Sequence, residues 1–297
     1  MSETSLPSPA ALRGTRVLSL ALNLPGPAAL MRCRDMGASC AKLEPPAPAG
    51  ADTADPMGVY SPAAYRALHA GVEILHANLK TDAGQALLQA ELARTDVLIT
   101  SFRPSALEKL GLGWEALRAR HPRLSLVAIV GAPGARAEEP GHDLTYQAES
   151  GLVPGTALPS TLYADMAGAL AASEAVLQAL LQRAASGHGV RIEVALSGAA
   201  HFLALPRDWG LTQPQGQVGG AHAGYQVYAC ADGRVAVAAL EPHFAAALCA
   251  AAGLPAGTDM QAPATHAAIA AFVRGQSRAQ LERLARERDI PLHTLAP

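Results

Sequence analysis

Aromatic and charged residues are scarce in this sequence of 297 residues. Phe, Trp and Tyr together make up 4% of the chain and charged residues 16%, whereas half of the residues are hydrophobic. Alanine supplies much of the apolar share, so we expect a finely packed, helix-rich core. The net charge is −2 and no block of basic residues occurs. This composition argues against nucleic acid and an anionic membrane surface as main partners.

Cysteine is also rare, and none of Cys33, Cys40, Cys230 and Cys249 belongs to a CxxC pair. We interpret them as buried thiols of a protein in a reducing compartment. No two histidines show HxxxH or HxH spacing, so the sequence predicts no metal site. The first residues lack the features of a signal peptide, and no apolar run reaches the roughly 18 residues of a membrane span. We therefore expect a cytoplasmic protein.

Common nucleotide-binding and hydrolase signatures are missing as well. The sequence has no P-loop and no GxGxxG, and "GAPGA" at 131–135 lacks the third glycine and a clean following helix. The nucleophile-elbow pattern GxSxG is absent, which argues against an α/β-hydrolase.

The first two thirds of the chain alternate between short apolar runs and helical patterns. The runs, each predicted to be a strand, fall at 15–22, 39–44, 71–79, 97–102 and 123–132. Helices are predicted between them, one of them capped by Thr81, and a loop is predicted for 46–62. This rhythm predicts an α/β fold with a Rossmann-like parallel sheet flanked by helices, in a large domain of residues 1–201.

A second, smaller domain is predicted for residues 222–297, after a linker at 202–221 that is rich in Gly, Pro and Gln. Two alternating runs about Asp232 and Gly233 predict a hairpin. Helices are predicted after it, the first beginning at Pro242 and ending before Gly253. The small domain is therefore of the α+β class.

Two titratable residues open predicted helices in the large domain. His142 precedes a short helix, whose positive end favours a neutral, basic imidazole. Asp165 lies in the first turn of a long alanine-rich helix, where the dipole favours the ionised carboxylate. Each could equally be a simple helix cap, and the same holds for Glu241, which precedes Pro242.

Several stretches together resemble the family III CoA-transferases, the CaiB/BaiF group, which include the α-methylacyl-CoA racemases. They lie at 12–46, 78–131, 140–152, 164–196 and 228–248, in the family's order and spacing. The resemblance places the family's catalytic aspartate at Asp165. In racemases this residue forms an acid–base pair with the histidine of a "GHD" motif, here His142, and a glutamate of an "EP" pair, here Glu241, supports the histidine.

The resemblance also implies the ligand and the assembly. Coenzyme A would be part of the substrate, with no permanently bound cofactor, and the chain would form a homodimer with a shared active site. The family's "NRGK"-like basic stretch is missing, which leaves Lys42 and Arg103 as candidates for contacts with coenzyme A. Gly141, Asp143 and Tyr146 complete the predicted acyl-CoA-binding residues. The chain ends earlier than full-length members of the family.

Three functions remain open. A racemase needs a base on one face of the carbon next to the thioester and an acid on the other, which His142 and Asp165 could supply. A CoA-transferase needs only Asp165, as the nucleophile that carries the acyl group. A non-catalytic homologue would merely bind acyl-CoA. We favour the racemase because three motif residues match it.

Overall fold

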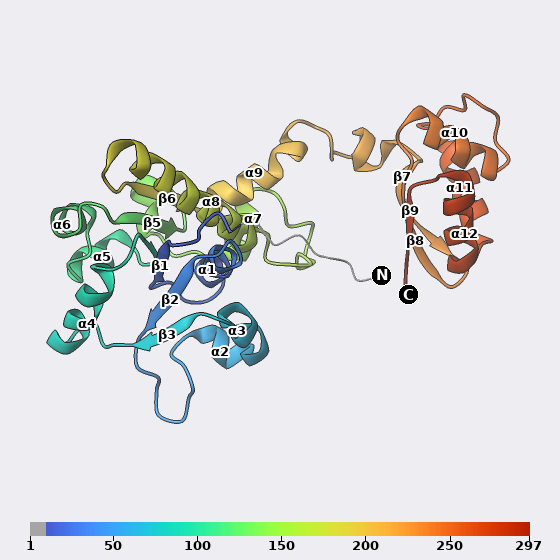
Figure 1. The fold of residues 1–297 in the computed structure, drawn as a ribbon. Helices are drawn as coiled ribbons and strands as arrows, with labels where there is room; N and C mark the ends of the chain where they lie inside the picture. The colour runs from blue at the N-terminus through green and yellow to red at the C-terminus, as the bar shows by residue number, and fades with distance from the viewer. Residues whose placement is uncertain (1–9) are drawn as a thin grey trace. The chain divides into compact units, whose positions relative to one another are not determined.

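The computed structural model describes residues 10–297. The chain divides into two compact units between Ala204 and Leu205 (Figure 1). This boundary lies inside the segment predicted as a linker.

The first unit is built on a six-stranded parallel sheet in the order β3-β2-β1-β4-β5-β6. Its strands are β1 (Arg16–Ser19), β2 (Ser39–Glu44), β3 (Glu73–His76), β4 (Val97–Thr100), β5 (Ser125–Val130) and β6 (Arg191–Ala195). This arrangement confirms the predicted α/β class. The strand β6 was missed because it lies at the sheet edge and carries Arg191 and Glu193, so no apolar run marks it.

Helices cover both faces of this sheet. The helices of this unit are α1 (Pro25–Asp35), α2 (Pro56–Tyr60), α3 (Pro62–His69), α4 (Asp82–Leu92), α5 (Pro104–Lys109), α6 (Trp114–Arg120), α7 (Asp143–Glu149), α8 (Tyr163–Ser186) and α9 (Leu196–Asp208), of which α9 crosses the boundary into the second unit. On β4, Val97 and Ile99 pack with α1 and α8 in one hydrophobic cluster, whereas Leu98 packs with α4 in another. The alternating side chains of central strands thus build two cores.

Two predicted irregular segments are helical instead. The expected loop at 46–62 contains α2 and the start of α3, because Asp55 caps α2 and Pro56 occupies a first-turn position that tolerates proline. The first part of the expected linker, up to Asp208, belongs to α9, which accommodates Pro206. As predicted, the Thr81 side chain accepts a hydrogen bond from the Gly84 N–H at the start of α4.

The helix α8 corrects the expectation that no apolar segment reaches membrane-spanning length. Its 24 residues, with a mean hydropathy of 1.2 in the best window, would suffice by length and composition. In the described structure 44% of that window is buried, and Ala169, Ala172 and Val176 belong to the core beside α1. One side of α8 thus packs in the core, whereas the other side is exposed.

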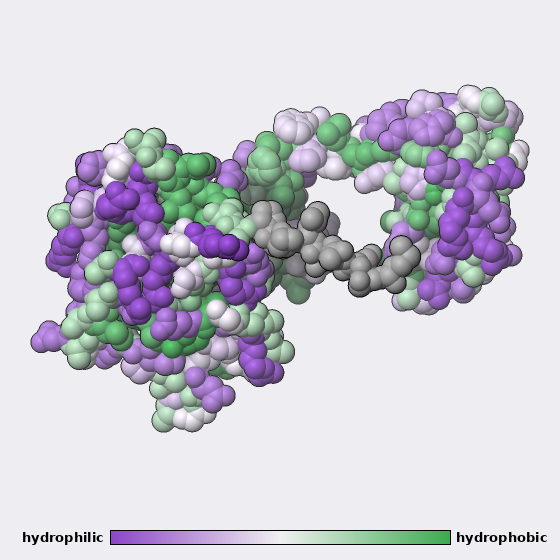
Figure 2. Space-filling view, in the orientation of Figure 1, coloured by the Kyte–Doolittle hydropathy of each residue, from purple (hydrophilic) through white to green (hydrophobic). Residues whose placement is uncertain are grey.

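The second unit is a small α+β domain. An antiparallel sheet, β7 (Tyr225–Cys230), β8 (Gly233–Ala238) and β9 (Leu292–Leu295), packs with α10 (Pro242–Ala251), α11 (Pro263–Arg274) and α12 (Arg278–Arg288). The predicted hairpin is confirmed, with Cys230 paired to Gly233 across the turn. The arginine-rich α12 shows a strongly hydrophilic outer surface in Figure 2.

Candidate active site

A cavity of about 760 Å³ opens in the first unit at the carboxyl ends of β1, β4 and β5. Asn23 lines it after β1, Arg103 after β4 and Gly131 after β5. The strands β1 and β4 are neighbours in the sheet although β2 and β3 separate them in sequence, so the strand order reverses here. Open α/β sheets bind their ligands in the crevice at such a switch point.

Most of the residues that the sequence nominated meet in this cavity. Six of the eight line it: Arg103, Gly141, His142, Asp143, Tyr146 and Asp165. The structure therefore brings His142 and Asp165 together, although 22 residues separate them in the chain. Their chemical roles stay predictions.

His142 is the residue that precedes α7, as predicted. Its backbone N–H donates to Thr145 Oγ1 at 3.1 Å, and the Thr145 hydroxyl donates back to the His142 carbonyl at 2.7 Å. These two bonds fix the backbone where α7 begins. The residue is exposed and lines the cavity.

Asp143 ties the start of α7 to the start of α8. Its Oδ1 accepts the backbone N–H of Asp165 at 3.0 Å, and its Oδ2 accepts a hydrogen bond from the Gln147 side chain. Since Asp143 is only 5% exposed, these bonds hold the two helix ends in register. The pair of helix starts is what brings the imidazole and the second carboxyl group into one cavity.

Asp165 is half-buried, and its protonation differs from the expectation. Burial, reinforced by the nearby charge of Asp143, raises the pKa of Asp165 to about 7. Desolvation thus outweighs the stabilisation of the carboxylate that the helix dipole was expected to give. Near neutral pH the carboxylic acid and the carboxylate coexist.

The Tyr146 ring lies against two glycines at the cavity wall. A Cβ on Gly131 would overlap the Tyr146 hydroxyl oxygen, and a Cβ on Gly141 would lie 2.5 to 2.7 Å from the hydroxyl and the ring carbons. Only glycine allows this approach at both positions. Burial raises the pKa of Tyr146, so its hydroxyl remains protonated and can donate a hydrogen bond.

Comparisons with known proteins show which family the chain belongs to. The model of CoA-transferase family III matches residues 12–296. The chain belongs to this family. The resemblance seen in the sequence is thereby confirmed.

The relatives of this family III chain include both racemases and transferases. It is 33% identical over 261 residues to the mouse α-methylacyl-CoA racemase, covering 82% of the chain and 65% of the mouse protein. It is 30% identical over 281 residues to the succinate–glutarate CoA-transferase of Agrobacterium fabrum, covering 86% and 70%. A CaiB/BaiF family protein of Brucella suis has a similar structure, with a TM-score of 0.78, 25% identity and coverage of 96% and 83%.

Lys42 lies outside the cavity, and its surroundings do not fit the predicted contact with coenzyme A. The side chain is fully buried. Its Nζ forms ion pairs with Glu44, at 2.8 Å, and with Asp55, and lies 3.0 Å from His69 Nε2. A lysine so enclosed balances internal charges and is inaccessible to a phosphate group in this conformation.

The partners of Lys42 form a group with the donor atoms of a metal site, which the sequence did not predict. One ligand atom each from Glu44, Asp55 and His69 lies within 4.8 Å of the others. In this family III chain the Lys42 ammonium contacts all three residues and supplies the positive charge. Lys42, Glu44, Asp55 and His69 therefore form a buried ion-pair network.

Glu241 belongs to the second unit. It is exposed and precedes α10, and its side chain makes no capping hydrogen bond there. The expected role as a helix cap is thus not realised through the carboxylate. Its role beside the histidine stays a prediction.

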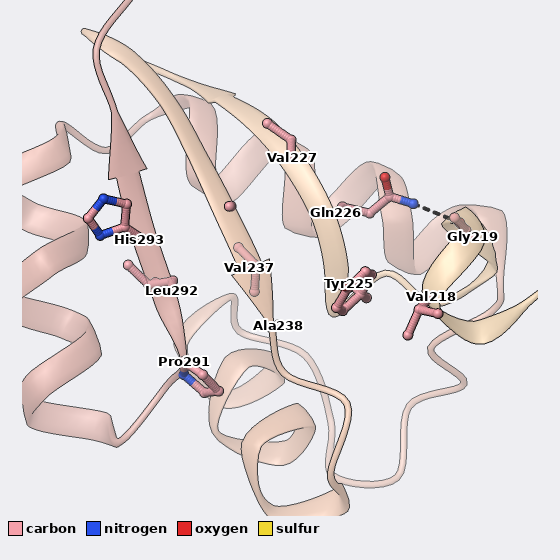
Figure 3. Close-up of a pocket in the computed structure, with 12 residues that line it drawn as sticks. Val218, Gly219, Tyr225, Gln226, Val227, Val237, Ala238, Pro291, Leu292 and His293 are labelled. Atoms are coloured by element: carbon pink, nitrogen blue, oxygen red, sulfur yellow. Dashed lines mark hydrogen bonds between the residues drawn. The ribbon is translucent and has the colours of Figure 1, made fainter. Parts of the chain in front are cut away.

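The second unit has a cavity of its own, of about 480 Å³, on the sheet (Figure 3). Apolar residues dominate its lining, among them Val218, Tyr225, Val227 and Leu292. The Gln226 side chain donates to the Gly220 carbonyl at 2.7 Å at its edge. None of the predicted site residues lines this cavity.

Four polar residues of the first cavity were missed: Asn23, Tyr60, Ser101 and Glu139. Tyr60 fell in the segment taken for a loop. Asn23 directly follows the first apolar run of the sequence, at the turn where the strand order reverses. Its position at the end of this predicted strand was the signal that could have pointed to the cavity.

Proposed function

We propose that the chain handles acyl-CoA and catalyses the racemisation or epimerisation of 2-methylacyl-CoA. The observation that carries this proposal is the meeting of His142 and Asp165, each at the start of its own helix, in one cavity. The similarity to the mouse racemase supports it.

The proposed reaction moves a proton across the α-carbon. The His142 imidazole removes the Cα proton, and the electron pair of the broken C–H bond moves into the thioester as an enolate. The protonated Asp165 then donates its proton to the opposite face of the same carbon. In the reverse direction the two groups exchange roles. A pKa of about 7 suits Asp165 to both tasks, since a catalytic acid or base works best near the ambient pH.

The cavity offers contacts for both parts of an acyl-CoA. Arg103 is the arginine of its lining and would meet a phosphate group of coenzyme A. Leu22, Phe102 and Leu144 give the acyl group an apolar wall. Coenzyme A is in this proposal part of the substrate, and no permanently bound cofactor takes part.

A CoA-transferase is the second candidate, supported by the similarity to the Agrobacterium fabrum enzyme. In that reaction the ionised Asp165 would attack the thioester carbonyl, the C–S bond would break, and coenzyme A would leave as its thiolate while the acyl group stays on Asp165 as an anhydride. A pKa of about 7 leaves much of Asp165 ionised near neutral pH and so suits a nucleophile as well as an acid; the presence of His142 in the same cavity is what favours the racemase.

We further propose a cytoplasmic homodimer with a shared active site, in which Glu241 of one subunit supports His142 of the other. Exposed apolar side chains on and before α8 support an assembly: Leu158, Leu162, Met166 and Leu170 are between 41% and 78% exposed. Such a group of apolar side chains is typical of an interaction surface.

Incubation with a chiral 2-methylacyl-CoA in D₂O tests the proposal. A racemase incorporates deuterium at Cα and loses optical purity, whereas a transferase passes coenzyme A to an added free acid. His142→Ala and Asp165→Ala should each lower exchange from one enantiomer by about 10²–10⁴-fold, because each group serves one face. The racemase is ruled out if both variants keep wild-type exchange from both enantiomers. An acyl-enzyme adduct on Asp165 would establish the transferase instead.

A further inference from the structure

Asn23 has an unusual backbone conformation for its residue type. It lies in the turn that leads from β1 to α1 and lines the cavity, with φ at 66°. Among residues 10–297, only Asn23 and Asp289 are non-glycine residues with positive φ. The left-handed region disfavours most side chains but tolerates asparagine, particularly when hydrogen bonds hold it there.

Two hydrogen bonds fix Asn23 from the same side. The Asn23 backbone N–H donates to Asp55 Oδ1 at 3.0 Å. The Tyr60 hydroxyl donates to the Asn23 side-chain Oδ1 at 2.9 Å. Backbone and side chain are therefore both oriented by the segment that carries α2.

The anchor behind the first of these bonds, Asp55, is rigid. Asp55 is fully buried, and its Oδ1 also accepts the Met57 N–H at 2.9 Å. Its Oδ2 is ion-paired with Lys42, which is fully buried and holds Glu44 as well. Removing one partner would leave an uncompensated buried charge, so this network resists rearrangement. Asp55 consequently offers Asn23 a fixed acceptor.

The amide of Asn23 is left with a free donor end. Because its Oδ1 accepts from Tyr60, the planar amide directs its NH₂ group away from that hydroxyl. Asn23, Tyr60 and Asp165 line the same cavity. Burial and then the charges of Asp55 and Asp165 raise the pKa of Tyr60, so its hydroxyl remains protonated and can donate to Asn23.

We propose that the Asn23 side-chain amide donates a hydrogen bond to the carbonyl oxygen of the substrate thioester, and that Tyr60 and Asp55 are positioning residues. The inference rests on the proposed function, in which this oxygen gains negative charge when the Cα proton leaves. A donor that is already oriented stabilises such charge without reorganisation. The same donor would serve the oxyanion formed during acyl transfer.

The matched variants are Asn23→Gly, which keeps the positive φ and loses the amide, and Asn23→Asp, which is nearly isosteric and loses the donors. Both should lower kcat for Cα exchange by about 10²–10³-fold. Their affinity for free coenzyme A should not change, because coenzyme A has no acyl carbonyl. Circular dichroism confirms that the variants fold.

An infrared measurement gives a second readout that does not depend on turnover. With a carbon-13 label at the thioester carbonyl of bound 2-methylacyl-CoA, the C=O stretch should lie at lower frequency in the wild type than in Asn23→Gly. Tyr60→Phe should lower kcat by about tenfold in the wild type, the effect of one lost hydrogen bond, and should have no further effect in Asn23→Gly.

The outcomes separate this inference from the function on which it rests. If Asn23→Gly keeps both kcat and the carbonyl frequency while His142→Ala loses exchange, the amide donor is refuted and the racemase stands. Additive losses for Tyr60→Phe and Asn23→Gly would refute the positioning role of Tyr60. Should the wild type bind no acyl-CoA, the proposed function fails and the inference fails with it.

Discussion

At the scale of single residues, the protonation of Asp165 is the property with the widest consequences. Burial and the neighbouring Asp143 raise its pKa to about 7, so a small change in pH near neutrality shifts Asp165 between the carboxylic acid and the carboxylate. A group buried beside a like charge and lining a cavity is a typical functional candidate.

The first prediction concerns the pH dependence of the two reaction directions. Both directions should show the same inflection near pH 7, where Asp165 titrates, because the ratio of kcat/KM for the two enantiomers equals an equilibrium constant that pH does not change. Measuring kcat/KM for each enantiomer across this range checks it. Two profiles that show no inflection near neutral pH would contradict it.

The second prediction concerns stability. The folded pKa of Asp165, about 7, lies above its ordinary value of 3.8, so burial favours the neutral form. The corresponding stability is present below pH 3.8 and is lost as pH rises through about 7. Replacing Asp165 with Asn should remove this loss.

Urea unfolding at a series of pH values measures the effect. The gain in unfolding free energy of Asp165→Asn over the wild type should grow from acidic to neutral pH and level off above it. Asp52→Asn, at an exposed loop position, is the matched control and should show no such trend. An unchanged difference at all pH values would show that the carboxyl group titrates normally.

At the scale of elements, the helices and strands that were predicted are those with a clear local pattern in the sequence. The strands β4 and β5 are buried along their whole length and read as apolar runs, so they were predicted. The partly exposed β6 and the proline-started α2 gave weaker signals and were missed.

The site shows the same limit. His142 and Asp165 stand at helix starts, which the sequence reveals through motif and spacing. The burial of Lys42 depends on Asp55 and His69, which meet it only in the folded chain. The position of Asn23 in the cavity depends on strand order, which the sequence does not specify.

The third prediction concerns the packing of α7 against the end of β5. Gly131→Ala should destabilise the protein by about 1–3 kcal/mol, because the new Cβ overlaps the Tyr146 hydroxyl. Tyr146→Phe should relieve this destabilisation, since it removes the hydroxyl and the next nearest atom, the ring carbon Cζ, lies 3.1 Å from the new Cβ. Thermal unfolding of the single and double variants measures both effects.

Gly141→Ala provides the contrast. Its Cβ would meet ring carbons of Tyr146 at 2.6 and 2.7 Å as well as the hydroxyl oxygen, so Tyr146→Phe should not rescue it. Equal rescue at the two positions would mean that the ring moves as a whole, and the predicted difference in contact would be wrong.

At the scale of the whole molecule, the family and its architecture are established, whereas the assembly is a proposal. The chain belongs to CoA-transferase family III and divides into an α/β unit and a small α+β unit. Its surface carries more large apolar side chains along α8 than a charged, solvent-facing helix would, among them Met166 and Leu170.

The fourth prediction follows from these side chains. Leu170→Asp should shift the homodimer towards monomer, because it places a charge in an apolar interface, and the shift should be seen by sedimentation over a concentration series. Leu181→Asp, three turns further along the same side of α8 and 73% exposed, shows how far the interface extends, because a similar shift would place Leu181 inside it. A Leu170→Asp protein with wild-type sedimentation would place the interface elsewhere.

The Lys42 cluster has a consequence for how the active-site wall is maintained. Two carboxylates and an imidazole that could have gathered around a metal ion are instead gathered around an ammonium group on the same chain. The central cation of this cluster is a side chain of the protein itself, the Lys42 ammonium. Every folded copy therefore contains this cation. Because Lys42 holds Asp55, and Asp55 accepts the Asn23 N–H, the turn that carries Asn23 is supported without any metal from the surroundings.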